Sequence, residues 1–232
     1  MASSESIPVV LVHGWAGSFR ETWQAPGIDA LLGDTGRDVI GFDLLGHGER
    51  DKPHDPEAYA DLPGWFLDNL PDAHPVVDVA AFSLGALTTL RALLASPARF
   101  GRVLLAGIGD GVFERSDGSG NRRIVDALEG RAPEDDTFAA AFAHYAHSPG
   151  KDLQALTAIM KRPPVDPLSE SDLASVPNEV CVVIGEKDFA GPATRLAAAF
   201  PNGRLVVLPR IDHFATPESF PFIDALLDFL AP

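Results

Sequence analysis

The most informative stretch of this chain is Ala80-Ala81-Phe82-Ser83-Leu84-Gly85-Ala86. It joins an apolar, β-branched run over 76–81 to a segment with helical spacing over 84–95. A strand that passes directly into a helix brings two backbone segments close together, so the turn needs small residues on both sides. Ala81 and Gly85 stand two positions before and two positions after Ser83. The pattern predicts a turn that lifts the Ser83 hydroxyl above a sheet, called a nucleophile elbow.

This pattern has one departure and one competing interpretation. The usual form is Gly-x-Ser-x-Gly, and Ala81 adds a methyl group where glycine is usual. An isolated Ser-x-Gly is more often only the N-cap of a helix. The strand before Ser83 and the helix after it favour the elbow.

Five other short apolar runs lie at 8–12, 38–42, 102–106, 180–184 and 204–208. Such runs are typical of strands buried on both faces of a parallel sheet. Helical patterns over 84–95, 194–200 and 217–230 alternate with them. The sequence therefore predicts an α/β fold: a doubly wound, mainly parallel six-stranded sheet with helices on both faces.

The segment 110–178 interrupts this alternation because it contains no convincing strand pattern. We expect a helical cap there, inserted between core segments 1–109 and 179–232. Phe138, Phe142 and Tyr145 fall at i, i+4 and i+7 of a helix in this cap. This stripe fits core packing, and it also fits a lid over a substrate pocket. In the lid interpretation, Phe82 and the three cap aromatics line the pocket.

A serine hydroxyl becomes a good nucleophile when a base removes its proton and a third group holds that base. His213 follows the last predicted strand, and Asp188 follows the strand before it. Both therefore belong at the carboxyl ends of the strands, with Ser83, where open parallel sheets bind ligands. Asp110 follows another strand and stays open as the alternative acid.

Attack on a carbonyl also needs hydrogen-bond donors for the negative oxygen that forms. The backbone N–H of Leu84, directly after the serine, is one candidate. The second is the N–H of Trp15, because Gly14 permits an unusual backbone after the first strand. His13 is expected to be a structural hydrogen-bonding residue.

Composition restricts the partners. The chain has 232 residues, 33 acidic and 18 basic, with a net charge of −15, so a nucleic acid or an anionic membrane surface is not expected to bind. Its 46% hydrophobic and 22% charged residues are ordinary for a globular protein.

No run is long enough to span a membrane and no leader pattern opens the chain, so the expected location is cytoplasmic. The single cysteine, Cys181, cannot form an intramolecular disulfide.

No motif indicates a cofactor or a metal. The chain has no Gly-x-x-x-x-Gly-Lys loop, and Gly107-Ile108-Gly109 lacks the rest of a dinucleotide fingerprint. His144 and His147 would bind a metal only with a third ligand, and a solvated surface is the expected setting. We expect a small-molecule substrate and no cofactor, and the sequence leaves the oligomeric state open.

Together these motifs resemble the α/β-hydrolase family over nearly the whole chain. The resemblance rests on His13-Gly14-Trp15, Asp43-Leu44-Leu45-Gly46-His47-Gly48, Ala81-Phe82-Ser83-Leu84-Gly85, Gly185-Glu186-Lys187-Asp188 with Pro192, and Asp212-His213. It implies a core without the family's leading antiparallel hairpin, with strand order 2-1-3-4-5-6 and a short cap. It also implies acyl transfer, because relatives that open epoxides or displace halides carry aspartate at the elbow.

We therefore expect a serine hydrolase that cleaves an ester or thioester of a small, partly apolar acyl substrate. The catalytic residues would be Ser83, Asp188 and His213. Hydrolysis of a carbon–carbon bond would use the same residues, so it stays open. A ligand receptor on the same scaffold is the alternative from another class of protein, because fold does not imply function.

Overall fold

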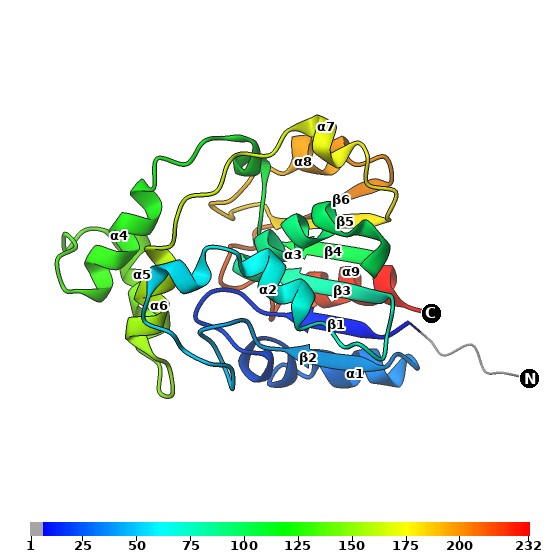
Figure 1. Cartoon of the computed structure of the whole chain (residues 1–232), viewed down its shortest axis with the longest axis horizontal. Coiled ribbons are helices and arrows are strands. Elements are labelled where there is room, and N and C mark those ends of the chain that lie inside the picture. The colour runs from blue at the N-terminus through cyan, green and yellow to red at the C-terminus, as the bar shows by residue number, and fades with distance from the viewer. Residues whose placement is uncertain (1–6) are drawn as a thin grey trace, which may run out of the picture.

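The computed structural model describes residues 7–232. The expectation that the chain has no leader rests partly on residues 1–6, which lie outside the described residues. The core is one open sheet of six strands (Figure 1). The strands are β1 (Val9–Val12), β2 (Val39–Phe42), β3 (Val77–Phe82), β4 (Phe100–Ala106), β5 (Val180–Gly185) and β6 (Gly203–Leu208). Every neighbouring pair is parallel, in the order β2-β1-β3-β4-β5-β6. The predicted strands and their order are confirmed.

Helices cover both faces of this sheet (Figure 1). One face packs against α1 (Ile28–Asp34) and α9 (Phe220–Leu230). The other face packs against α2 (Leu62–Asp68), α3 (Leu84–Ala95) and α8 (Thr194–Ala199). Alternate residues along each strand enter alternate cores, as the two-residue period of a strand requires. The doubly wound arrangement is therefore confirmed.

Two predicted helices are shorter than their apolar pattern, and proline accounts for both. Helix α8 ends at Ala199 because Phe200 precedes Pro201, and a residue before proline avoids the helical conformation. Helix α9 begins at Phe220 because Ser219 is still extended and Pro221 lies in the first turn. Proline is tolerated there, since its missing N–H would have no helical partner.

The segment 110–178 contains helices and no strand. Helices α4 (Ser119–Leu128), α5 (Thr137–Ala146) and α6 (Leu153–Met160) pack together beyond the carboxyl ends of the strands (Figure 1). Helix α7 (Glu170–Leu173) instead lies against α8 of the core. Across residues 7–232, no helix has both the length and the apolar character needed to cross a membrane.

Candidate active site

Ser83 lies at the sharp turn between β3 and α3, with φ 52° and ψ −114°. A positive φ is strained for a residue with a side chain, and it persists only where the surroundings hold it. Gly85 shows why the turn needs small neighbours, because a Cβ there would come 2.4 Å from the carbonyl oxygen of His13. The backbone N–H of Ser83 is held by the carbonyl of Ala106, 2.8 Å away.

Ser83, His213 and Asp188 form one hydrogen-bonded chain. His213 Nε2 lies 3.0 Å from Ser83 Oγ, and His213 Nδ1 lies 3.0 and 2.9 Å from the two carboxylate oxygens of Asp188. An ionised carboxylate only accepts hydrogen bonds, so Nδ1 carries the proton and Nε2 is left to accept from the serine hydroxyl. The side chains of His213 and Asp188 are buried. The arrangement can remove the Ser83 proton.

The alternative acid, Asp110, has a different position. Its Oδ1 accepts the backbone N–H of Leu196 at 2.8 Å, and its own N–H donates to the carbonyl of Pro192 at 2.7 Å. These bonds attach the end of β4 to the loop and helix that follow Asp188. The carboxylate beside His213 is therefore that of Asp188, and Asp110 holds the loop that carries it.

The loop after β1 lies directly against the elbow. A Cβ on Gly14 would come 3.0 Å from Phe82 Cδ1 and 3.2 Å from Ser83 Cβ, so a side chain there would crowd the elbow. Within residues 7–232, neither the N–H of Trp15 nor that of Leu84 donates to a protein acceptor. The Leu84 N–H is free because the first N–H groups of a helix have no helical partner. Two free donors beside a nucleophile fit an oxyanion hole.

Two buried histidines hold this loop in place. His13 donates from Nδ1 to the Gly14 carbonyl at 2.7 Å, and its Nε2 accepts the Leu44 N–H at 3.1 Å. The Nε2 of His47 accepts the N–H of Ala16 at 3.0 Å. Burial lowers the pKa of His13, and burial together with the neighbouring His13 lowers the pKa of His47 well below its ordinary value. Both rings are therefore neutral near pH 7.

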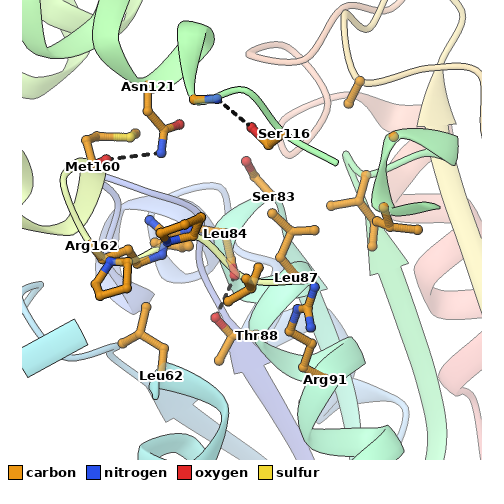
Figure 2. A pocket seen from close by; sticks show the side chains of 18 of the residues that line it. Leu62, Ser83, Leu84, Leu87, Thr88, Arg91, Ser116, Asn121, Met160 and Arg162 are labelled. Atoms are coloured by element: carbon orange, nitrogen blue, oxygen red, sulfur yellow. Dashed lines mark hydrogen bonds between the residues drawn. The ribbon is translucent and has the colours of Figure 1, made fainter. Parts of the chain in front are cut away.

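Ser83 and His213 line a cavity of about 840 Å³. Its walls come from α3, from α4 of the cap, from the loop after β4 and from the segment 160–168 (Figure 2). Much of the lining is apolar, with contributions from Leu62, Leu84, Leu87, Leu90, Ile108, Val112, Val125, Met160 and Leu168. The cavity has the size and the apolar lining of a small-molecule site.

The sequence profile of the Alpha/beta hydrolase family matches residues 9–225, nearly the whole chain. The chain belongs to this family. No curated protein sequence matches this α/β hydrolase.

Solved structures share its fold. A candidate non-heme bromoperoxidase, BpoC from Mycobacterium tuberculosis H37Rv, is 21% identical with a TM-score of 0.72, over 97% of this chain and 92% of that one. A 2-hydroxy-6-oxo-6-phenylhexa-2,4-dienoate hydrolase from Rhodococcus sp. strain RHA1 is 19% identical with a TM-score of 0.68, and the match covers 99% of this chain and 92% of that one. A hydrolase from Pseudomonas aeruginosa PA01 is 23% identical with a TM-score of 0.69, and the match covers 100% of this chain and 92% of that one.

The aromatic residues predicted for the pocket lie elsewhere in the hydrolase. The cavity lining includes none of Phe82, Phe138, Phe142 and Tyr145. Phe82 packs into the core on the α9 face, with its ring 4.9 Å from that of His213. Phe142 packs on Trp15 at 5.8 Å, between the cap and the loop after β1. Phe142 belongs to the hydrophobic core, with Phe138 and Tyr145 packed against it, while Phe138 and Phe142 also contact Phe189 beside His213. Their role in substrate binding stays a prediction.

Three features of the site carry no signal in the sequence pattern. Phe189 lines the cavity, and its ring lies 4.4 Å from that of His213. The indole N–H of Trp15 donates to the carbonyl of Leu156 at 3.2 Å and so attaches the cap to the loop after β1. The bond from Ala16 to His47 likewise joins two separate loops. Such contacts follow from tertiary packing, although Phe189 is adjacent to the predicted acid.

Proposed function

We propose that this α/β hydrolase is a serine hydrolase that cleaves an ester or thioester of a small, partly apolar acyl substrate. The observation that carries the proposal is the continuous chain from Ser83 Oγ through His213 to the buried carboxylate of Asp188. A serine without such a base is a poor nucleophile, and a histidine without an acceptor for Nδ1 has no fixed tautomer.

In the first half of the reaction, His213 takes the hydroxyl proton of Ser83 as the oxygen attacks the substrate carbonyl. The negative oxygen that develops is stabilised by the N–H groups of Trp15 and Leu84. Asp188 stays ionised and stabilises the imidazolium. His213 then gives its proton to the departing alcohol or thiol, which leaves the acyl group on Ser83.

In the second half, a water molecule replaces the leaving group. His213 removes a proton from this water as its oxygen attacks the acyl carbonyl, and the same two N–H groups stabilise the second oxyanion. When this intermediate collapses, His213 returns the proton to Ser83 Oγ and the carboxylic acid is released. The enzyme ends in its starting state.

The cavity supports the substrate class. Leucine side chains of α3 and of neighbouring segments surround the approach to Ser83, so an acyl chain with methylene groups can bury them there. Neutral chromogenic esters of medium acyl chains are therefore the first substrates to test.

Carbon–carbon bond hydrolysis is the second candidate, because two of the structures with this fold are meta-cleavage product hydrolases. That reaction would use Ser83 and His213 but must deliver a proton to carbon. Loss of absorbance of a 2-hydroxy-6-oxo-dienoate, in the absence of ester turnover, would favour it over the esterase.

The deciding experiment measures the intact mass of wild type and Ser83→Ala after exposure to a fluorophosphonate. An adduct on the wild type alone, together with multiple turnovers of a 4-nitrophenyl ester, is the expected result. Absence of any adduct on folded wild type would overturn the proposal. A single acylation without turnover would instead favour a ligand receptor on the hydrolase scaffold.

A further inference from the structure

The catalytic cavity runs along one face of α3. Ser83, Leu87 and Arg91 are spaced four residues apart, which places them on the same side of the helix, and all three line the cavity (Figure 2). At 1.5 Å per residue, Arg91 lies about 12 Å along the helix axis from the nucleophile. The apolar side chain of Leu87 lies between them. The cavity is therefore a channel with a nucleophile near one end and a cation near the other.

A second cation, Arg162, enters the channel from the segment after α6. Figure 2 shows it to the left of Leu87 and Arg91, and all three line the cavity. Each guanidinium donates to a backbone carbonyl: Arg162 to Ile159 at 2.7 Å and Arg91 to Asp166 at 2.6 Å. Within residues 7–232, neither guanidinium forms an ion pair with a carboxylate. The Asp166 carboxylate instead pairs with the exposed Arg115 at 3.3 Å.

Two other cations of the same cavity do have carboxylate partners. Arg131 pairs with Asp126 at 2.7 Å, and Lys161 pairs with Glu129 at 2.7 Å. The chain carries 33 acidic residues against 18 basic ones, so carboxylates are abundant. The two channel arginines form no such ion pair and, unlike the exposed Arg122 of the same cavity, both are half-buried.

The two guanidinium groups by themselves form an electrostatically unfavourable arrangement. Both arginines are half-buried. Burial lowers the pKa of Arg162, and the charge of Arg91 lowers it further, which means that the two like charges influence each other. Burial also lowers the pKa of Arg91, and the charge of the Asp166 carboxylate offsets this only in part. An arginine stays charged in proteins, so a partly desolvated pair that forms no ion pair with a carboxylate is stabilised when a ligand supplies the negative charge.

We propose that Arg91 and Arg162 form an anion subsite, so that the preferred substrate is an ester or thioester whose acyl chain ends in a carboxylate. This rests on the proposed function, because the same channel must hold the scissile carbonyl at Ser83. A guanidinium matches a carboxylate in geometry and can donate two parallel hydrogen bonds to it. Leu62 and Leu87 would cover the methylene groups between the carbonyl and the terminal charge.

The test compares two substrates of equal length: the 4-nitrophenyl half-ester of adipic acid, and the same compound with its free carboxylate methylated. Wild type is expected to prefer the half-ester by about tenfold or more in kcat/KM, the size of one charge-assisted interaction. Succinyl and suberyl half-esters then report the chain length that best spans the channel. Equal rates for the charged and methylated compounds at every length would overturn the proposal.

The variants Arg162→Gln and Arg91→Gln should reduce this preference, and Arg162→Lys should restore part of it because the charge returns. Arg122→Gln is the matched control. Arg122 also lines the cavity and donates to a backbone carbonyl, that of Asp117, but its side chain is exposed. It should keep the wild-type preference. If Arg122→Gln lost as much of the preference for the half-ester as Arg162→Gln, the preference would come from the overall positive potential of the cavity, and the proposed subsite would be refuted.

A binding measurement separates this proposal from the proposed function. Monomethyl adipate is titrated by calorimetry into Ser83→Ala and into the double variant Ser83→Ala/Arg162→Gln, both checked for an unchanged thermal midpoint. Weaker binding to the double variant supports the subsite even if no ester is ever hydrolysed. Equal binding, with neutral esters still hydrolysed by wild type, refutes the subsite and leaves the serine hydrolase standing.

Discussion

Replacing Asp188 by asparagine keeps the size of the side chain and removes its charge. Both carboxylate oxygens lie within 3.0 Å of His213 Nδ1, and Oδ1 also accepts the Ala190 N–H at 2.9 Å. An asparagine that keeps the bond to Ala190 through its oxygen turns its NH₂ group toward Nδ1. Nδ1 must then accept, so the ring proton moves to Nε2. His213 in that tautomer cannot take the proton of Ser83.

The size of the effect follows from this change of tautomer. The substitution leaves the backbone and the two proposed oxyanion donors in place, so only the proposed general-base function should be lost. A wrong tautomer in a triad of this kind costs about 10³- to 10⁴-fold in kcat. At 1.36 kcal/mol for each factor of ten, this corresponds to about 4 to 5 kcal/mol of transition-state stabilisation.

The assay is steady-state hydrolysis of a neutral 4-nitrophenyl ester by Asp188→Asn, with the thermal midpoint as a check on folding. Asp110→Asn is the matched control, because its amide oxygen can still accept the N–H of Leu196. We expect it to stay within about threefold of wild type. The reasoning is refuted if Asp188→Asn retains more than about a tenth of wild-type activity, or if both variants lose activity equally.

Three further predictions concern the framework of the site. Gly85→Ala places a Cβ 2.4 Å from the carbonyl of His13, so the midpoint of urea unfolding and the ester kcat should both fall; an unchanged kcat would contradict the close approach. Trp15→Phe removes the bond to Leu156 and should lower the free energy of unfolding by about 1 kcal/mol, measured in urea. His13 and His47 have folded-state pKa values below the ordinary 6.5, so the unfolded chain binds their protons first as pH falls. Stability should therefore be lost as pH falls below 6.5 toward those values, by up to about 1.4 kcal/mol per pH unit for each ring, and His47→Gln should flatten this slope; a flat profile in wild type would refute it.

Much of the core could be predicted because its signals are local. Buried parallel strands are short apolar runs, and proline, glycine and serine mark their ends. Ser83 was recognisable because the elbow needs particular residues at neighbouring positions, and Gly85 shows the steric reason. The aromatic stripe of α5 was ambiguous, because its spacing shows which residues share a face and does not show what that face contacts.

The residues alone indicated the strand–turn–helix around Ser83, the six strands and the candidate acids and bases, whereas the order of the strands came from the resemblance to the α/β-hydrolase family. The features read from the residues depend on positions close together in the chain, such as the apolar run of a strand and the small residues beside the turn. Only the tertiary structure decided between Asp188 and Asp110, turned Phe82 away from the cavity and brought Arg91 and Arg162 into one channel. These outcomes depend on side-chain direction and on contacts between distant segments, which no local pattern of residues encodes.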